Sequence, residues 1–228
     1  MPKSVIKLDK IDKSYQIGKK RLLPVIKHVS LEIEKGDFVA FMGPSGSGKS
    51  SLMNIIGLLD WPTDGLYELD GQNILEIAKR EFPKMRGKKI GFIFQSYNLL
   101  PRYSVYKNVE LPLIYAKEPR AERKQKVLDA IKSVGITERM HHKPNELSGG
   151  EAQRAAIARA LVNQPEIILA DEPTGNLDTK TGREIMELLK AANQRGTTLL
   201  IVTHDPEIAK WANKTIRIVD GELEGANV

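Results

Sequence analysis

The sequence predicts an α/β protein in which a mainly parallel sheet is joined by a small antiparallel β subdomain near the N-terminus. Three observations support this class: four short apolar runs, amphipathic helical patterns between them, and an N-terminal stretch that alternates apolar and polar residues. Continuous apolar runs suit strands buried on both faces, as in a parallel sheet covered by helices. The 228 residues, of which 41% are hydrophobic, are enough to bury a sizeable core.

The buried strands are expected at Phe38–Met42, Ile90–Phe94, Ile167–Ala170 and Thr198–Thr203. Residues 29–37 alternate between apolar and polar side chains, which is typical of a strand with one buried face. Residues 66–71 end in Asp-Gly, the pair that favours a tight hairpin. These last two segments predict the small antiparallel sheet.

Helical patterns lie between these strands. One follows a glycine-rich loop at residues 50–59. Two others, at residues 122–135 and 183–196, place their apolar side chains on one face and end at a glycine. A glycine in this position is a common helix C-cap.

The composition excludes several classes of protein. The chain has no cysteine, which rules out disulfides and thiolate metal sites and favours a reducing compartment. Its start lacks the apolar core of a signal peptide, and no apolar run approaches the roughly 20 residues needed to span a bilayer. The formal net charge of +6 suits nucleic acid or anionic lipid, but acidic residues interrupt the basic stretches, which favours a solvated surface.

A polar or glycine-rich feature directly follows each of the four apolar runs. In chain order these features begin at Gly43, Gln95, Asp171 with Glu172, and His204. In an open parallel sheet, the carboxyl ends of the strands line one crevice in which ligands bind. Four such features together predict one composite site at this edge.

The first of these features is a phosphate-binding loop. Residues 43–50 read GPSGSGKS, which fits the pattern G-x-x-x-x-G-K-[ST] between a strand and a helix. The glycines let backbone N–H groups surround a polyphosphate, Lys49 would reach the β- and γ-phosphates, and the Ser50 hydroxyl would bind Mg²⁺. The residues expected to contact the nucleotide here are Gly43, Pro44, Ser45, Gly46, Ser47, Gly48, Lys49, Ser50 and Ser51.

The other strand ends supply acidic and polar groups. Asp171 is placed to hold Mg²⁺ through its water shell, and Glu172 is the candidate general base or water-positioning residue. Gln95 is expected to reach Mg²⁺ or the attacking water, and His204 to contact the γ-phosphate. Each residue alone is more often an ordinary loop or strand-end residue, but the shared edge and the phosphate loop favour the catalytic interpretation.

A second anion-binding helix start is predicted in residues 147–161, which read LSGGEAQRAAIARAL. A serine and two glycines precede an alanine-rich amphipathic helix, the sequence form of a helix N-terminus left open for an anion. The chain therefore has two predicted anion-binding helix starts, one here and one at the phosphate loop.

These motifs resemble, in order and context, those of the ATP-binding cassette (ABC) ATPases: GPSGSGKS, Gln95, LSGGE, ILADEPTGNLD and VTHD. The resemblance covers nearly the whole chain, and its most specific element is the stretch similar to the family's signature motif. In the family, two cassettes pair head to tail, with each ATP between the phosphate loop of one and the signature motif of the other. The resemblance therefore implies that Ser148, Gly149 and Gly150 bind the γ-phosphate held by a second copy.

Further expectations follow from the same resemblance. Tyr15 is similar to the aromatic residue that stacks on adenine, although a tyrosine there also suits the packing of a small sheet. Asp178 is similar to the residue that crosses the dimer interface, and Glu151 differs from the glutamine that often follows LSGG. The family fold is a P-loop NTPase core, here a single nucleotide-binding domain over residues 1–228 with an inserted helical subdomain at about residues 96–164.

Residues 52–65 and 108–116 resemble the lipoprotein-releasing and macrolide-exporting (MacB/LolD-type) branch. In that branch, ATPase cycles drive a membrane subunit that moves substrates outward or works mechanically on the periplasmic side. Because the chain ends at Val228, we expect the membrane part on a separate chain, or the chain to be a cassette cut from a longer protein. We expect a cytoplasmic subunit, peripheral on the inner face of the cell membrane, that binds ATP, Mg²⁺, a permease and a second copy of itself.

Two other functions stay open at the level of sequence. One is a soluble ABC-type ATPase acting on nucleic acid or ribosomes, and such relatives usually carry two cassettes, a long coiled coil or zinc cysteines. This chain has one phosphate loop and no cysteine, so no nucleic-acid partner is expected. The other is a non-hydrolysing nucleotide sensor, against which Glu172 and His204 argue.

The segment after Gln95 is unusually apolar and aromatic for a loop. Tyr97, Leu99, Leu100 and Tyr103 lie within it. Exposed apolar patches on loops usually mark interaction surfaces, and in the family this region receives a coupling helix from the membrane subunit. We therefore expect a docking groove here; the alternative is that these side chains fill the core of the helical subdomain.

Overall fold

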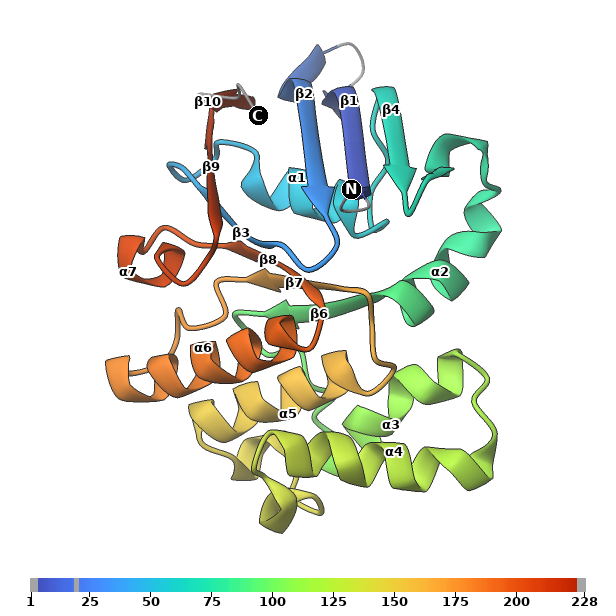
Figure 1. Ribbon diagram of the computed structural model, residues 1–228, viewed down its shortest axis with the longest axis vertical. Coiled ribbons are helices and arrows are strands. Elements are labelled where there is room, and N and C mark those ends of the chain that lie inside the picture. The colour runs from blue at the N-terminus through green and yellow to red at the C-terminus, as the bar shows by residue number, and fades with distance from the viewer. Residues whose placement is uncertain (1–3, 19–20, 225–228) are drawn as a thin grey trace. The chain divides into compact units, whose positions relative to one another are not determined.

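The computed structural model describes residues 4–18 and 21–224, which divide into two compact units (Figure 1). The first unit contains the described residues up to Phe82 and those from Leu200 onward. The second unit runs from Pro83 to Leu199. Both units mix helices with strands, in agreement with the predicted α/β class.

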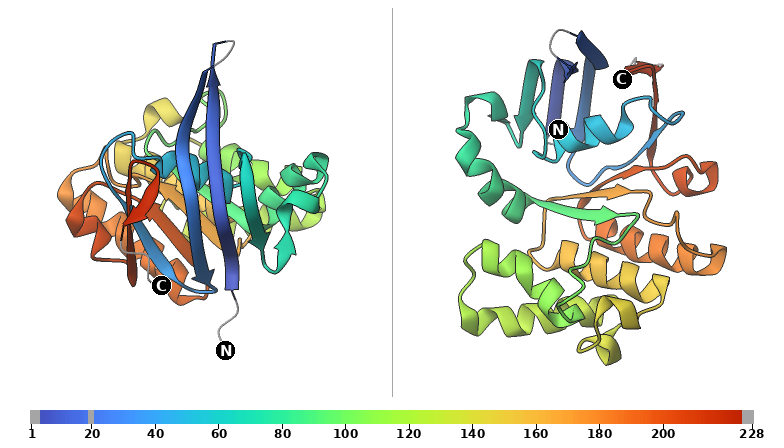
Figure 2. Two further views of the ribbon diagram at one scale, coloured as in Figure 1. Left: turned by 90° about the horizontal axis from the view of Figure 1, so that it is seen from above. Right: turned by 180° about the vertical axis from the view of Figure 1, so that it is seen from behind.

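The first unit contains a four-stranded sheet in the order β2-β1-β4-β5. Its pairings are antiparallel, and β1 and β2 form the long hairpin seen in Figure 2. The strands are β1 (Ser4–Ile17), β2 (Arg21–Glu34), β4 (Asp64–Leu69) and β5 (Gln72–Asn73). The predicted alternation is confirmed in β2, where Val29, Leu31 and Ile33 are buried between exposed neighbours. The Asp-Gly hairpin also forms, because Asp70 and Gly71 both adopt the positive φ that such a turn requires.

The same unit contains parallel strands. β3 (Phe38–Met42) pairs in parallel with β9 (Lys214–Val219), and β10 (Glu222–Glu224) pairs antiparallel with β9. Residues 38–41 are buried on both faces, as the continuous apolar run predicts. The helices of this unit are α1 (Lys49–Ile56), α7 (Pro206–Ala209) and two 3-10 turns, Ile74–Glu76 and Lys79–Glu81.

The second unit is mainly helical. Its helices are α2 (Phe82–Lys89), α3 (Val105–Tyr115), α4 (Arg120–Ser133), α5 (Gly149–Leu161) and α6 (Thr179–Gln194), with 3-10 turns at Thr137–Arg139 and Pro144–Glu146. α3, α4 and α5 pack against one another (Figure 1), and α5 also packs on β6 (Ile90–Phe94). This last contact is close: a Cβ on Gly91 would lie 2.6 Å from the Ala160 carbonyl oxygen.

β6 pairs in parallel with β7 (Ile167–Asp171), and β8 (Thr198–Val202) carries the chain from the second unit back to the first. All four apolar runs are therefore strands, as predicted. The helix expected at residues 50–59 ends earlier, at Ile56, because the backbone of Leu58 has a positive φ of 56°. The other two predicted helices are α4 and α6, and the glycine after each has a positive φ. Among the described residues, no helix is long and apolar enough to cross a membrane.

Candidate functional site

The phosphate loop leaves β3 at Gly43 and enters α1 at Lys49. Two of its glycines are required by close contacts. A Cβ on Gly43 would lie 2.0 Å from the Ile218 carbonyl oxygen, and one on Gly48, whose φ is +101°, would lie 2.7 Å from Ile26 Cδ1. The loop is also tied to the β9–β10 turn, because the Gly221 N–H donates to the Ser47 carbonyl at 3.1 Å. The predicted loop is thus formed and held by the first unit itself.

Lys49 places its ammonium group over this loop. Its Nζ donates to the carbonyl oxygens of Gly43 at 2.8 Å and Pro44 at 2.7 Å. No side chain caps the N-terminus of α1, whose N-cap is Gly48, and its first turn contains no acidic residue. The first N–H groups of a helix have no internal acceptor and carry partial positive charge. The loop, Lys49 and this helix start therefore suit a polyphosphate.

Tyr15 lies beside this helix. Its hydroxyl oxygen is 3.5 Å from Ser51 Oγ, and it donates to Asp60 Oδ2 at 2.7 Å. Burial raises the pKa of Tyr15, and the Asp60 hydrogen bond raises it further. Burial alone would raise the pKa of Asp60, but hydrogen bonds from Lys13, Tyr15 and the Trp61 N–H outweigh it and lower that pKa. The predicted adenine-stacking residue is thus anchored through its hydroxyl group.

His204 is exposed and follows the buried Thr203 at the end of β8. The Thr203 N–H donates to the Phe41 carbonyl at 3.1 Å. His204 therefore follows a residue bonded to β3, the strand that leads into the phosphate loop. Asp205 then caps the short helix α7 by accepting from the Glu207 N–H at 2.8 Å. The first unit therefore brings His204 to the same strand edge as the loop, as predicted.

The second unit brings Gln95 and the acidic pair together. Phe94 and Asp171 are paired residues of the parallel strands β6 and β7, so Gln95 and Glu172 each come one residue later at the same edge. Gln95 also bonds to the loop beyond Glu172: its Nε2 donates to Asn176 Oδ1 at 3.3 Å, and Asn176 Nδ2 donates to its carbonyl at 3.0 Å. Asn176 was not anticipated from the sequence.

Glu172 has an unusual backbone conformation, with a φ of +45°. This left-handed region is rare for residues other than glycine and is often found at functional sites. The turn is held from two sides: the Gly175 N–H donates to the Glu172 carbonyl at 3.1 Å, and Gln153 Nε2 donates to the Pro173 carbonyl at 2.6 Å. Gln153 is fully buried on α5 and was missed from the sequence, where a glutamine in an alanine-rich helix gives no sign of burial.

The start of α5 differs from its prediction. Instead of an open N-terminus, Ser148 and Glu151 form a capping box: Ser148 Oγ accepts from the Glu151 N–H at 3.3 Å, and the Ser148 N–H donates to Glu151 Oε2 at 2.8 Å. Arg139 Nε also donates to Glu151 Oε1 at 2.7 Å. Serine and glutamate three residues apart are the sequence pattern of this box, so it was visible in the sequence. Gly149 and Gly150 remain in the first turn, where backbone N–H groups have no internal acceptor.

Asp178 serves as the N-cap of α6. Its carboxylate accepts from the Thr181 N–H at 3.0 Å and from Thr181 Oγ1 at 2.6 Å. These hydrogen bonds lower the pKa of Asp178. The side chain is exposed.

The residues predicted to bind Mg²⁺ are oxygen donors: the hydroxyl of Ser50 in the first unit, and Gln95 and Asp171 in the second. Mg²⁺ commonly takes one or two carboxylates, several waters and the phosphates of a nucleotide rather than a cage of protein side chains. Within residues 4–18 and 21–224, no group of three or more His, Asp or Glu residues could hold a metal by itself. The donor set therefore fits a Mg²⁺ ion that arrives with its nucleotide.

Comparison with known proteins gives one consistent result. A family model described as ABC transporter matches residues 26–175. The uncharacterized ABC transporter ATP-binding protein YvrO of Bacillus subtilis is 51% identical over 219 residues, which cover 96% of this chain and 95% of that protein. MacB of Bdellovibrio bacteriovorus, a macrolide export ATP-binding/permease protein, is 50% identical over 220 residues, which cover 96% of this chain but 33% of that protein.

A solved structure is similarly close. The cassette MJ0796 of Methanocaldococcus jannaschii, in a dimeric post-hydrolysis state bound to ADP and Pi, matches with a TM-score of 0.88 and 46% identity. The match covers 96% of both chains. The likeness therefore extends over both the phosphate-loop unit and the helical unit.

Proposed function

The chain belongs to the ABC transporter family, and we propose that it is the ATP-hydrolysing subunit that powers a separate membrane permease. It is an ATPase, converting ATP and water to ADP and phosphate, and it has the fold of cassettes that do so. The observation that carries the proposal is the phosphate loop with Lys49 at an uncapped helix start. MacB, which is about three times as long, is by its name an ATP-binding/permease protein, and this supports a permease as the partner.

In the proposed mechanism, backbone N–H groups of the loop and Lys49 bind the phosphates, and Tyr15 stacks on adenine. Ser50, Asp171 and Gln95 would hold Mg²⁺, which would neutralise charge on the phosphates. Glu172 orients a water molecule and accepts its proton as the water oxygen attacks the γ-phosphorus and ADP leaves. His204 contacts the γ-phosphate. The strained turn at Glu172, held by Gln153, supports a role that needs a fixed carboxylate direction.

We propose that the working form is a head-to-tail dimer in which Ser148, Gly149 and Gly150 bind the γ-phosphate held by the other copy. The related cassette MJ0796 was solved as a dimer, which supports this assembly. Asp178 is the residue proposed to reach the other copy. It is exposed, although its carboxylate already caps α6.

The hydrolysis proposal is tested with Glu172→Gln. This variant should lower ATP turnover by roughly 10²- to 10⁴-fold, the usual effect of losing a general base. ATP binding should survive, because the phosphate loop is unchanged. Glu187→Gln is the matched control, since it makes the same substitution at an exposed glutamate of α6 that the mechanism does not use. Turnover of Glu172→Gln close to that of the parent chain would remove Glu172 from the catalytic role.

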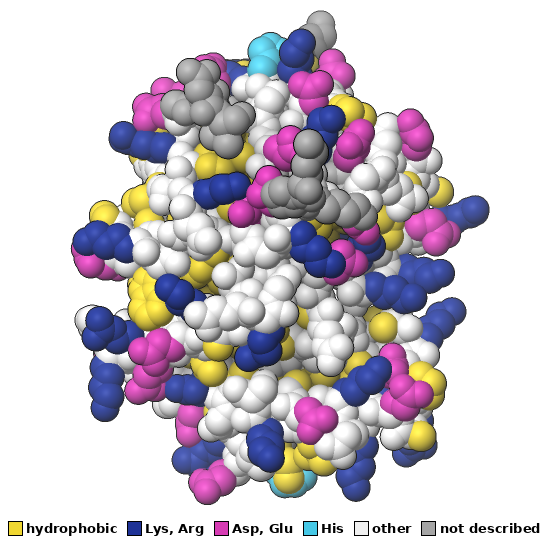
Figure 3. Space-filling view, viewed as in Figure 1, with side chains coloured by type: hydrophobic (Ala, Val, Ile, Leu, Met, Phe, Trp, Pro, Cys, Tyr) yellow, Lys and Arg dark blue, Asp and Glu magenta, His cyan; other side chains and the backbone are white. Residues whose placement is uncertain are grey.

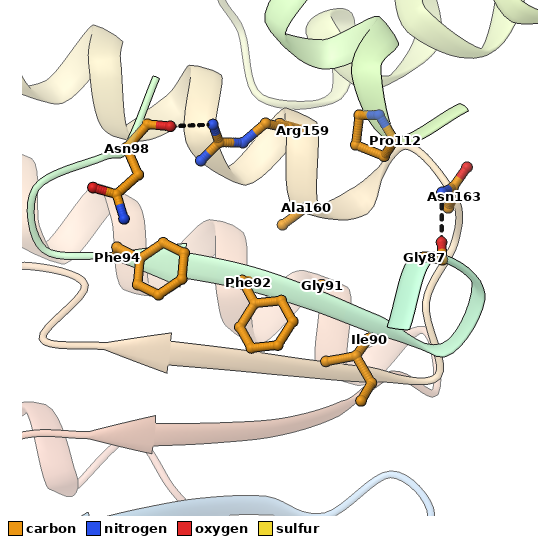
Figure 4. A pocket seen from close by; sticks show the side chains of 10 residues that line it. All are labelled: Gly87, Ile90, Gly91, Phe92, Phe94, Asn98, Pro112, Arg159, Ala160 and Asn163. Atoms are coloured by element: carbon orange, nitrogen blue, oxygen red, sulfur yellow. Dashed lines mark hydrogen bonds between the residues drawn. The ribbon is translucent and has the colours of Figure 1, made fainter. Parts of the chain in front are cut away.

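The second unit has an apolar cavity, drawn in Figure 4, that supports a docking site for the permease. It is a cavity of about 240 Å³ between β6, α3 and α5. Phe92 and Phe94 stack along β6 with ring centroids 5.9 Å apart, and Pro112 and Ala160 complete the apolar wall. The polar rim is formed by Asn98, Arg159 and Asn163. We propose that a short helix of the permease docks here. Asn98 belongs to the segment after Gln95, but the docking residues predicted from the sequence, Tyr97, Leu99, Leu100 and Tyr103, are not among those that line this cavity.

The predicted docking residues divide into two groups. Leu100 and Tyr103 are 44% and 45% exposed, whereas Tyr97 and Leu99 are half-buried. The exposed pair is presented by a rigid loop, because the buried amide of Asn108 bonds to the backbone of residues 100, 103 and 104. Leu100 and Tyr103 are therefore surface residues, and packing in the helical core does not account for them.

Polar substitution of Leu100 and Tyr103 distinguishes a role in permease docking from a role in stabilising the fold. Leu100→Ser and Tyr103→Ser should weaken co-purification with the permease while leaving the ATPase activity and melting temperature of the isolated subunit nearly unchanged. Val105→Ser is the contrasting control: Val105 is fully buried, so this variant should lower the melting temperature. A large fall in melting temperature for Leu100→Ser or Tyr103→Ser would withdraw the docking role of that residue.

Charge on the surface bears on the nucleic-acid alternative. On the face shown in Figure 3, Lys and Arg side chains are interspersed with Asp and Glu rather than gathered in one patch. Many basic groups are engaged in ion pairs, such as Arg154 with Glu184 at 2.7 Å and Lys214 with Asp37 at 2.9 Å. Nucleic-acid binding proteins usually concentrate positive charge on one face, and the face in Figure 3 gives no such support to the nucleic-acid alternative.

A further inference from the structure

Tyr15 belongs to a network that the family resemblance did not anticipate. The network consists of Lys13, Tyr15, Asp60 and Trp61, all in the first unit. Lys13 Nζ donates to Asp60 Oδ1 at 2.6 Å and to the Trp61 carbonyl at 2.7 Å. The Trp61 N–H donates to the same Asp60 oxygen at 2.7 Å, and Tyr15 donates to the other oxygen at 2.7 Å. Asp60 therefore accepts three hydrogen bonds, of which only one comes from the tyrosine.

Lys13 is unusually buried for a lysine. Its side chain is 10% exposed, and its ammonium group lies 4.7 Å from the centroid of the Tyr15 ring. A cation at this distance from an aromatic face is attracted to it. Lys13 therefore occupies one face of the Tyr15 ring, and we expect a stacking partner to use the opposite face.

Asp60 is itself firmly placed. The loop that carries it runs from α1 to β4 and is bonded at both ends. On the α1 side, the Asp60 N–H donates to the Asn54 carbonyl at 3.1 Å. On the β1 side, the Thr63 N–H donates to the Asp12 carbonyl at 2.7 Å. Trp61 stacks on Phe82 with ring centroids 4.9 Å apart. The carboxylate is thus a fixed point beside the helix that follows the phosphate loop.

We propose that the Lys13–Asp60 pair is a positioning clamp that holds the Tyr15 ring as a ready-made platform for adenine. This inference rests on the proposed role of Tyr15 in nucleotide binding. Without the clamp, the tyrosine side chain would lose rotamer freedom each time a nucleotide bound, and that entropy would be subtracted from the affinity. With it, the ring is already in place. Lys13 and Asp60 act through Tyr15 and need no contact with the nucleotide.

The cleanest test is Tyr15→Phe, which keeps the ring and removes only the hydroxyl that Asp60 holds. Asp60→Ala removes the other side of the bond, and the double variant completes a cycle. Affinities for ATP and for inorganic triphosphate are measured by calorimetry on the full chain. Each single variant should bind ATP about 3- to 10-fold more weakly, the usual effect of one net hydrogen bond. The double variant should bind ATP no more weakly than Asp60→Ala alone, because Asp60→Ala has already removed the hydrogen bond that Tyr15→Phe would break.

Triphosphate lacks the base, so its affinity should be the same in all of these variants. Asp9→Ala is the matched control. Asp9 is exposed on the same strand and contacts Ser30 rather than Tyr15. Its affinity for ATP should equal that of the parent chain. Equal losses for ATP and triphosphate in Asp60→Ala would show damage to the phosphate loop and overturn the clamp.

Tyr15→Ala separates the clamp from the proposed adenine contact. Loss of a base-stacking ring should weaken ATP binding by roughly 10- to 100-fold. If Tyr15→Ala has this effect and Tyr15→Phe binds ATP like the parent, the clamp is wrong and the adenine contact stands. If Tyr15→Ala also binds like the parent, the adenine contact itself is wrong and the clamp falls with it.

Discussion

The two glycine-rich helix starts of this chain look alike in sequence and differ in charge. α1 begins at Gly48 and Lys49, without a side-chain cap and without an acidic residue in its first turn. α5 begins with a serine cap and carries Glu151 in its first turn, where a carboxylate already offsets the positive end of the helix. An anion therefore meets a full positive charge and uncapped N–H groups at α1, but a partly neutralised helix end at α5.

We expect this difference to set the order in which the two helix starts bind a nucleotide. The phosphate loop is built to bind a nucleotide on its own, because Lys49 adds a charge-assisted contact to the backbone donors. The start of α5 is stabilised before any ligand arrives, so it gains less from an anion and suits a second, weaker contact to a phosphate that is already bound. The comparison thus agrees with a nucleotide that binds one chain first and joins two chains afterwards.

The prediction with the largest expected effect tests the difference between the two helix starts. In the Glu172→Gln background, Lys49→Ala should weaken ATP binding by the isolated chain about 10- to 100-fold, because it removes a charged hydrogen-bond donor. Ser148→Arg should leave that binding nearly intact and instead abolish the ATP-dependent dimer, because the arginine fills the second anion site. Calorimetry gives the affinity, and sizing chromatography with light scattering gives the mass.

Ser148→Ala is the control for this experiment. It removes the cap without filling the site, so a dimer should still form with ATP. The assignment of the two helix starts is wrong if Ser148→Arg weakens ATP binding as much as Lys49→Ala, or if Ser148→Arg still dimerises with ATP.

A second prediction compares the glycines at the two starts. Gly48→Ala should destabilise the chain by about 2–3 kcal/mol, because φ is +101° and the new Cβ would lie 2.8 Å from the Val25 carbonyl oxygen. Gly149→Ala should change stability by less than about 1 kcal/mol, since its backbone is helical and the nearest atom is the end of the Tyr97 side chain at 2.9 Å. Urea denaturation measures both. Equal losses would mean that the two loops are held in the same way.

The sequence predicted the strands and the phosphate loop because both follow from local patterns. Four apolar runs gave four strands, and the glycine or polar residues predicted after each run lie at or just beyond its carboxyl end. The sequence did not reveal the residues that hold the site in place. Gln153, Asn176 and Asp60 act through contacts 20, 81 and 45 residues away along the chain, and no local pattern encodes such pairings. Their polarity alone suggests an ordinary surface residue.

The prediction of an open helix N-terminus at α5 was wrong for a different reason. Its glycines drew attention to an anion site, while the serine and glutamate of a capping box stood in the same five residues. The glycines suggest an unoccupied helix N-terminus, but Ser148 and Glu151 cap it and the Glu151 carboxylate offsets its positive charge. The change from the usual glutamine to Glu151 therefore matters, because a carboxylate adds negative charge where a glutamine would not.

The prediction with the smallest expected effect concerns the contribution of the Glu151 carboxylate to stability. Arg139 and the Ser148 N–H lower the pKa of Glu151 to about 2, below the value of 4.5 expected without these partners. A carboxylate whose pKa is lower in the folded state stabilises the fold above the unfolded pKa, and this contribution is lost as the pH falls through the folded pKa. Glu151→Gln should therefore be less stable than the parent by about 1 kcal/mol at pH 7, with the gap closing between about pH 4.5 and pH 2. Urea denaturation across this range measures the gap.

A second variant tests whether the ion pair is the cause. In an Arg139→Gln background, Glu151→Gln should lower stability only slightly further, because Arg139→Gln has already removed the ion pair. A gap that stays constant with pH would show that the hydrogen bond of the capping box, and not the charge of Glu151, stabilises the start of α5.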